Sequence, residues 1–212
     1  MTATSRPAPD EQTVFVVDDD ESVRNSLRWL LESIRLRVET FASAESFLEN
    51  GSAQRPGCLV LDVRMPGMSG PELMDRLNDS GAHLPIIFLS AHGDVPLAVR
   101  AMKGGAVDFL QKPYNNRQFL ERVRQALEKD ARLRAQQSRM GNYEKRVAAL
   151  TPRERQVLDK VVAGLSNKLI ARELDISYKT VEAHRSRLMR KMGVDTFAQL
   201  MQLVLRQGDA GD

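Results

Sequence analysis

Chemically reactive side chains follow four short apolar runs of the sequence, at the point where each run ends. The runs cover residues 13–17, 58–61, 85–89 and 107–110, and the side chains after them are Asp18, Asp19, Asp62, Ser90 and Lys112. Apolar runs of this length, bounded by turn residues, are typical of buried β-strands. In an open parallel sheet the carboxyl ends of the strands share one edge, where ligands bind. We therefore expect these five side chains to meet at one site.

The expected site combines three carboxylates with a hydroxyl and an ammonium group. Neighbouring carboxylates repel one another, and burying them unpaired is costly. Mg²⁺ relieves this repulsion, because it prefers oxygen ligands and keeps several waters free for a phosphate. Mg²⁺ and Lys112 can then neutralise the charge that develops as a phosphoryl group moves onto Asp62, while Ser90 donates to a phosphate oxygen. The simpler alternative is that the aspartates only cap the helices that follow.

Strands and helices must alternate to bring these residues together. Residues 38–41 form one further strand candidate, and helices are predicted around residues 23–34, 44–50, 70–78, 95–103 and 119–127. Gly51 is expected to close the second of them. The first and last helices carry apolar residues at three- and four-residue steps, as expected for one buried face. Five strands alternating with five helices predict right-handed crossovers and an α/β domain whose parallel sheet is covered on both faces.

The second half of the chain predicts only helices. Residues 151–154 supply an N-cap, a first-turn proline and a capping box for the first of them. Ser166 caps a short second helix, Ser177 caps a third that reaches about residue 192, and a fourth covers residues 196–206. Two short helices joined by a tight turn to a third helix with basic residues make a helix-turn-helix.

The third helix of this region carries the candidate DNA-reading residues. At about 100° per residue, a helix that buries Val181 turns a row of cationic, small and hydroxyl side chains outward. Such a row suits the major groove, with a solvated helix face as the alternative. Arg185 lies nearer to the core edge, and His184 is expected to pack or cap. The candidate DNA-binding residues are Lys179, Thr180, Glu182, Ala183, Arg185, Ser186, Arg187 and Arg190.

Charge and composition separate two regions and narrow the classes of protein. The net charge is −3 over residues 1–127 and +3 over each of residues 128–150 and 151–212. An acidic region followed by basic ones favours nucleic acid as a partner of the second. The apolar runs are shorter than the roughly 20 residues of a membrane helix, so no membrane partner is expected. A single cysteine, Cys58, permits no internal disulfide, which suits a reducing cytoplasm.

Five short motifs lie in order along the first half of the chain: Val16-Val17-Asp18-Asp19, Leu61-Asp62, Met65-Pro66-Gly67, Ser90-Ala91 and Lys112-Pro113. Together they resemble the receiver domain of bacterial response regulators. The resemblance implies a flavodoxin-like (βα)5 domain with strand order 2-1-3-4-5. It also implies that Asp62 accepts a phosphoryl group from a sensor histidine kinase.

The same resemblance implies roles for individual residues. Asp19, the phosphoacceptor carboxylate and the backbone carbonyl of Arg64 look like Mg²⁺ ligands, with Asp18 acting mainly through water. Ser90 and Phe109 match the switch pair of the family, in which the hydroxyl moves toward the phosphate and the aromatic ring turns inward. Ser90 stands where many relatives have Thr, and the missing methyl group could loosen that coupling.

The motifs of the second half resemble the LuxR-type helix-turn-helix: Leu150-Thr151, Arg153-Glu154, Ser166-Asn167-Lys168, Ile170-Ala171, Ile176-Ser177, Thr180-Val181 and His184. The run from His92 to Pro96 looks like the FixJ branch of the FixJ/NarL family in particular. The predicted division is a disordered tail (1–12), a receiver domain (13–127), a helical linker (128–149), a small all-α DNA-binding domain (150–207) and a second disordered tail (208–212). Gly141-Asn142 is expected to break the linker helix.

The two resemblances imply a two-component transcriptional regulator rather than an enzyme. It is expected to dimerise when phosphorylated, to bind double-stranded promoter DNA in the cytoplasm and to act with RNA polymerase. A phosphatase of the haloacid-dehalogenase type also uses a strand-end Asp with Mg²⁺, but it would want a second Asp where this chain has Arg64. An interaction module that dimerises without touching DNA is the other alternative.

Overall fold

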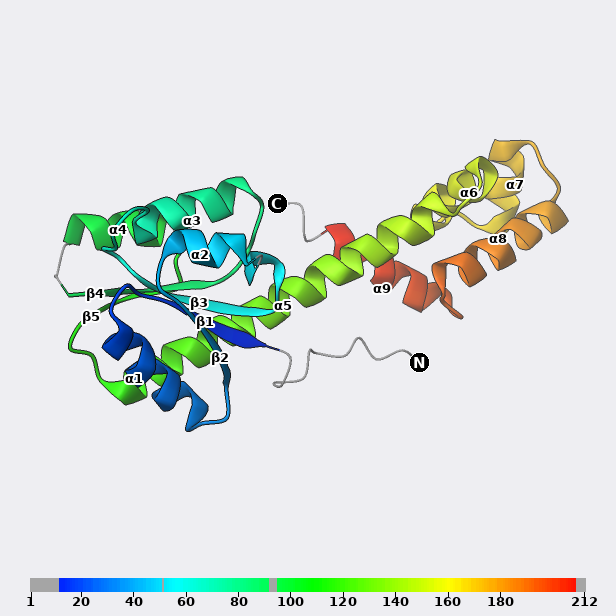
Figure 1. The fold of residues 1–212 in the computed structure, drawn as a ribbon. Coiled ribbons are helices and arrows are strands. Elements are labelled where there is room, and N and C mark those ends of the chain that lie inside the picture. Colours follow the sequence, from blue (N-terminus) through cyan, green and yellow to red (C-terminus); the bar gives the residue numbers. More distant parts are fainter. Residues whose placement is uncertain (1–11, 51, 92–94, 209–212) are drawn as a thin grey trace. The chain divides into compact units, whose positions relative to one another are not determined.

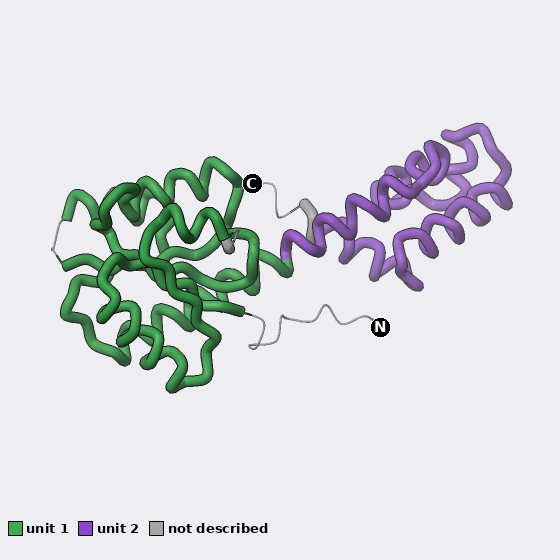
Figure 2. Tube along the Cα trace, in the orientation of Figure 1, with its two compact units in different colours: residues 1–135 green, residues 136–212 purple. Residues whose placement is uncertain are grey.

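The computed structural model describes residues 12–50, 52–91 and 95–208, and the chain divides into two compact units. Unit 1 covers residues 1–135 and unit 2 covers residues 136–212 (Figure 2). Gly51, the predicted His92-Gly93-Asp94 run and most of both predicted tails lie outside the described residues. One residue assigned to the first tail is described and differs from that expectation. Gln12 is buried, and its Nε2 donates to the carbonyl oxygen of Leu127 at 2.8 Å.

Unit 1 is built from strands and helices that alternate along the chain (Figure 1). Its strands are β1 (Thr13–Val17), β2 (Arg37–Phe41), β3 (Gly57–Asp62), β4 (Ile86–Ser90) and β5 (Asp108–Gln111). Its helices are α1 (Glu21–Glu32), α2 (Ala44–Glu49), α3 (Gly70–Asp79), α4 (Val95–Lys103) and α5 (Asn116–Ala148), with a short 3-10 helix η2 (Ser52–Gln54). All strand pairs are parallel, in the order β2-β1-β3-β4-β5, which confirms the predicted flavodoxin-like fold.

The sheet of unit 1 is apolar because helices cover both of its faces. β1, β3 and β4 are buried along their whole length. Helices α1 and α5 pack on one face, and α2, α3 and α4 pack on the other (Figure 1). The register pairs Val17 with Leu61 and Asp62 with Leu89. The residues that follow β1 therefore arrive at the same sheet edge as Asp62.

Unit 2 contains the end of α5 and four further helices: α6 (Pro152–Val162), α7 (Asn167–Leu174), α8 (Tyr178–Met192) and α9 (Phe197–Gly208). The predicted capping box is confirmed, because Thr151 and Glu154 each bond the backbone N–H of the other. The core of the unit joins all five helices, and Val181, Leu188 and Met192 bury the inner face of α8 as predicted.

Helix α5 is longer than the sequence predicts. It runs for 33 residues without a break at Gly141-Asn142, and the boundary between the two units falls within it. A glycine inside a helix costs about 1 kcal/mol relative to alanine. Packing of Tyr143 and Val147 against the core of unit 2 offsets that cost. The expected break is therefore absent.

Candidate functional site

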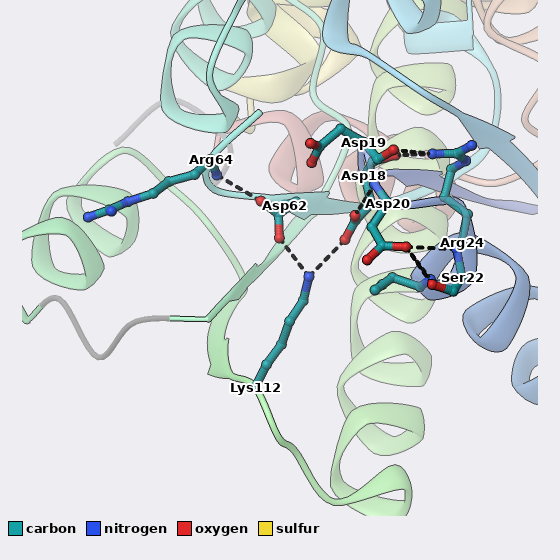
Figure 3. A network of polar contacts seen from close by, with 9 residues as sticks. Asp18, Asp19, Asp20, Ser22, Arg24, Asp62, Arg64 and Lys112 are labelled. Atoms are coloured by element: carbon teal, nitrogen blue, oxygen red, sulfur yellow. Dashed lines mark hydrogen bonds and ion pairs between the residues drawn. The ribbon is translucent and has the colours of Figure 1, made fainter. Parts of the chain in front are cut away.

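Lys112 lies between two buried carboxylates at the carboxyl edge of the sheet (Figure 3). Its Nζ donates to Asp62 Oδ1 at 2.7 Å and to Asp18 Oδ2 at 2.8 Å. Asp18 is 2% exposed and Asp62 is 8% exposed, so little water screens the charges. Two buried carboxylates would repel one another strongly in such surroundings, and the ammonium group compensates both. The structure thus brings together three of the five side chains that the sequence places at this edge.

The protonation of these groups follows from their contacts. Burial opposes the charge of Lys112, but the hydrogen bonds to Asp18 and Asp62 outweigh it and raise the pKa of the ammonium group. Burial also raises the pKa of the Asp18 carboxyl, against the lowering effect of Lys112. The site therefore holds a firmly charged lysine at its centre.

Backbone N–H groups fix the second oxygen of each carboxylate. Asp18 Oδ1 accepts from the N–H of Asp20 at 2.9 Å, and Asp62 Oδ2 accepts from the N–H of Arg64 at 2.8 Å. In both cases the donor lies two residues after the carboxylate, in a local turn that aspartate side chains favour. Both carboxylates are held in place on two sides before any substrate arrives.

The capping alternative accounts for one aspartate of the acidic run. Asp20 is the N-cap of α1, and its Oδ1 accepts from the N–H of Ser22 at 2.8 Å. Asp18 bonds Lys112 instead, and the Asp19 side chain is exposed beside it (Figure 3). Capping thus explains the one aspartate of the run that was not predicted to take part in the chemistry.

The remaining predicted residues of this region lie at or near the same edge. Ser90 ends β4 and is 3% exposed, and its carbonyl oxygen accepts from the N–H of Lys112 at 2.7 Å. Phe109, on the neighbouring strand β5, is half-buried, and its ring centroid lies 6.3 Å from that of Phe88. Arg64 is exposed and contributes its backbone to the site. Ser90 and Phe109 therefore lie on the adjacent strands β4 and β5, two residues apart in register.

The chemistry of the donor set suits Mg²⁺. Asp18, Asp19 and Asp62 offer only oxygen atoms, and Mg²⁺ is usually held by one or two carboxylates with water in the other positions. Among the described residues, no three histidine, cysteine or acidic side chains surround a common metal position. Lys112 lies between the two buried carboxylates. The oxygen donors at this edge therefore fit Mg²⁺ in kind, with water filling the positions that the carboxylates leave open.

Two charged side chains that the sequence patterns did not single out hold the loops of the site. Arg24, on α1, donates from Nη1 to the carbonyl oxygens of Asp18 at 2.7 Å and Asp19 at 2.9 Å (Figure 3). Glu45, on α2, accepts from the N–H of Met68 at 2.9 Å, in the loop after β3. The only signal in the sequence was a charged residue in the first two turns of a helix, where such side chains are ordinarily solvated. That signal does not distinguish either residue from its neighbours.

The predicted DNA-reading face of α8 divides into exposed and half-buried residues. Six of the eight residues are exposed: Lys179, Glu182, Ala183, Ser186, Arg187 and Arg190. Thr180 and Arg185 are half-buried and bonded within the unit. The Thr180 hydroxyl lies 2.8 Å from the Ser177 hydroxyl at the N-cap, and Arg185 Nη1 donates to Asn167 Oδ1 at 2.5 Å. His184 is half-buried, so it belongs to neither the exposed face nor the fully buried one.

A flavodoxin-like domain with this acidic edge, joined to a helix-turn-helix unit, defines a response regulator with a DNA-binding output domain. Residues 14–124 match the response regulator receiver domain, and residues 148–204 match the bacterial regulatory proteins of the luxR family. The chain belongs to the response regulator family with LuxR-type output, and it is a DNA-binding transcriptional regulator of a two-component system. The receiver domain implies a sensor kinase as partner, and the LuxR-type domain implies DNA binding.

Similar proteins cover nearly the whole chain. It is 50% identical to the transcriptional regulatory protein TdiR of Thauera aromatica over 92% of this chain and 86% of that protein. It is 46% identical to the transcriptional regulatory protein FixJ of Azorhizobium caulinodans over 95% of this chain and 96% of that one. Among solved structures, the response regulator StyR is 47% identical, with a TM-score of 0.86 over 92% of this chain and 99% of the StyR chain. These relatives agree with the predicted FixJ branch.

The described helices include none with the length and apolar character needed to cross a lipid bilayer.

Proposed function

We propose that Asp62 is the phosphoacceptor of this chain and that its phosphorylation controls the binding of α8 to promoter DNA. The observation that supports this most directly is the bridge from Lys112 to Asp62 and Asp18. A lysine with a raised pKa, bonded to a carboxylate at a strand end, is poised to stabilise negative charge that arrives on that carboxylate.

Each residue of the site has a separate role in the proposed phosphoryl transfer. A carboxylate oxygen of Asp62 attacks the phosphorus atom of a kinase phosphohistidine, the P–N bond breaks, and the imidazole leaves with its electron pair. Lys112 compensates the charge on the transferred group, and the Ser90 hydroxyl donates to a phosphoryl oxygen. Mg²⁺, held by Asp19, Asp62 and the carbonyl of Arg64, supplies further positive charge at the phosphoryl oxygens when it is bound.

The phosphodonor is proposed to approach from the side of α1. A cavity of about 370 Å³ opens there, lined by Ser22, Val23, Ser26, Lys112, Pro113 and Tyr114. Lys112 therefore lines this cavity and also bonds the acidic pair. This arrangement lets a donor reach the site without unfolding any helix.

The signal is proposed to pass from the phosphorylated edge to the output domain through Ser90 and Phe109, which change position together. The receiver then forms a homodimer, and two output domains bind half-sites related by a two-fold axis. The exposed row of α8 reads promoter DNA, and the bound regulator acts with RNA polymerase in the cytoplasm.

A comparison of Asp62→Asn with Asp75→Asn tests the proposal. Both variants remove one carboxylate, but Asp75 lies on α3 in an exposed pair with Arg100. The full-length proteins are incubated with acetyl phosphate and Mg²⁺, and acid-labile phosphate and DNA affinity are measured. Asp62→Asn should lose both phosphate uptake and its effect on DNA affinity, whereas Asp75→Asn should keep them. Phosphate uptake by Asp62→Asn at the wild-type level would refute the proposal.

We infer that the chain is a regulator and not a phosphatase. The haloacid-dehalogenase alternative needs a second acid two residues after the nucleophile, and Arg64 occupies that position with its side chain exposed. Sustained turnover of p-nitrophenyl phosphate by the wild-type protein, lost in Asp62→Asn, would instead favour that enzyme class. A salt-sensitive gel shift separates the regulator from an interaction module that never binds DNA.

A further inference from the structure

Arg185 differs from the other cations of the predicted DNA-reading row of α8, because its side chain bonds within unit 2. Lys179, Arg187 and Arg190 are exposed, whereas Arg185 is half-buried. Its Nη1 donates to Oδ1 of Asn167 at 2.5 Å, across 18 residues of chain. Asn167 is itself half-buried and is the first residue of α7. The contact therefore joins the start of one helix of the helix-turn-helix to the middle of the other.

The apolar contacts between these two helices set their relative angle only to within about 15–20°. Ile170 of α7 and Val181 and Leu188 of α8 are all fully buried in one cluster. Apolar packing is non-directional, so it tolerates small rotations of one helix about another. A hydrogen bond from a guanidinium group has a preferred distance and angle, and a charged donor makes it one of the stronger kinds. Such a bond restricts the rotation that packing allows.

The relative angle of these helices matters for DNA. In a helix-turn-helix the second helix lies in the major groove while the first crosses the phosphate backbone. Both can engage one duplex only when their angle matches the geometry of the groove. We propose that Arg185 is a positioning residue, which holds α7 and α8 in the DNA-binding arrangement through Asn167 and does not itself contact a base. This proposal rests on the DNA-binding function of the LuxR-type domain.

A double-mutant cycle separates positioning from direct contact. The full-length variants are Arg185→Met, Asn167→Ala and the double variant, with Arg187→Met as a control that removes the same charge two residues further on. The probe is a duplex selected from a random pool by the wild-type protein. Affinity is measured over a range of salt concentrations, and circular dichroism confirms that each variant is folded at the assay temperature.

If Arg185 acts through Asn167, its replacement should lower affinity about tenfold in the wild-type background, in the range of coupling between contacting residues. In the Asn167→Ala background the same replacement should change affinity less than about twofold. The slope of log affinity against log salt should stay near its wild-type value in Arg185→Met, whereas Arg187→Met, which removes an exposed cation of the reading row, should reduce it by about 1. Arg185→Lys, which keeps one donor, should recover most of the affinity.

The opposite pattern would overturn the proposal. A residue that reads a base or phosphate should lose the same affinity in both backgrounds, because its effect does not depend on Asn167. A bidentate contact with guanine would also not be rescued by lysine, which lacks the planar fork of arginine. Unchanged affinity in a folded Arg185→Met protein would equally exclude the role. Failure of phosphorylation control would leave this result untouched, since the assay compares unphosphorylated proteins.

Discussion

The acidic edge of the receiver and the outer face of α8 use charge in contrasting ways. At the edge, Lys112 is bonded to two carboxylates that are almost fully buried, and backbone N–H groups hold both of them. On α8, the exposed cations face solvent along one side of a helix whose opposite side is core. The side chains of the acidic edge are thus held in place before a phosphodonor arrives. The exposed cations of α8 face solvent and become ordered only when DNA binds.

Substitutions in the two regions should therefore differ in their effects on stability and on binding. Buried charges that compensate one another contribute to stability only as a set, so removing one leaves the others unpaired. Exposed charges on a helix contribute little to folding, so their removal acts on binding alone. The receiver site therefore couples function to stability, whereas the outer face of α8 does not.

Replacing Lys112 by Met should produce the largest effect. It leaves Asp18 and Asp62 buried without their shared cation, which should lower the free energy of unfolding of the receiver by about 3–5 kcal/mol. Urea unfolding followed by circular dichroism measures this change, with Lys103→Met on α4 as an exposed control. An unfolding midpoint equal to that of the control would show that the site is not a coupled set.

Glu154 tests whether unit 2 also contains buried charges that stabilise the fold only together. Its carboxylate is buried and bonds Lys191 at 2.7 Å and the N–H of Thr151 at 2.9 Å, and these contacts lower its pKa to about 2. A lowered folded-state pKa stabilises the fold above the unfolded-state value near 4.5, and that contribution is lost as the pH falls toward 2. Glu154→Gln should therefore be less stable than wild type by about 1–3 kcal/mol at neutral pH.

The difference between wild type and Glu154→Gln should shrink as the pH is lowered from about 4.5 to about 2. Thermal unfolding of the two proteins at a series of pH values gives this difference directly, and it cancels the titration of other carboxyl groups. A gap that stays constant with pH would mean that the Lys191 contact contributes nothing through charge.

Arg24 should have an intermediate effect that is confined to the receiver. It holds the two backbone carbonyls of the β1–α1 loop, so its loss should let Asp18 and Asp19 move while the core stays intact. Arg24→Met should weaken Mg²⁺ binding about tenfold, as loss of a supporting contact commonly does. Titration calorimetry with Mg²⁺ measures the affinity, and Arg28→Met is the control one turn along α1. Equal Mg²⁺ affinity in both variants would dismiss the role of Arg24.

Lys179→Ala should give the smallest change in stability and a clear change in binding. Its side chain is exposed at the start of α8, so unfolding should change by less than about 0.5 kcal/mol. DNA affinity should fall, and the slope of log affinity against log salt should decrease by about 1 if a phosphate contact is lost. Gel shifts at several salt concentrations provide both values. An unaltered slope would place the reading surface elsewhere.

The sequence predicted the ends of the strands because the apolar runs that precede them are short and clearly bounded. The apolar runs before Asp18, Asp62 and Ser90 are short and bounded by turn residues, which favours buried strands, and parallel topology then puts their ends at one edge. The capping box of unit 2 was equally predictable, since Thr151 and Glu154 are three residues apart and bond each other. Local rules suffice where both partners lie within a few residues.

Contacts between distant residues could not be predicted in the same way. Nothing near Arg24 in the sequence shows that its side chain turns back to carbonyl oxygens, and Arg185 shares its helix with similar cations that remain exposed. Helix α5 is the clearest case, because Gly141 favours a break locally and packing of Tyr143 and Val147 overrides it. In each case the deciding partner is supplied by the tertiary fold.

The continuity of α5 has a practical consequence for dividing the molecule. The last turns of this helix supply Tyr143 and Val147 to the output core, and Arg146 donates to the carbonyl oxygen of Met192 at the end of α8. A fragment that starts at the family motif near Leu150 would omit all three. An isolated output domain should instead begin near Gln136, where the boundary between the units falls.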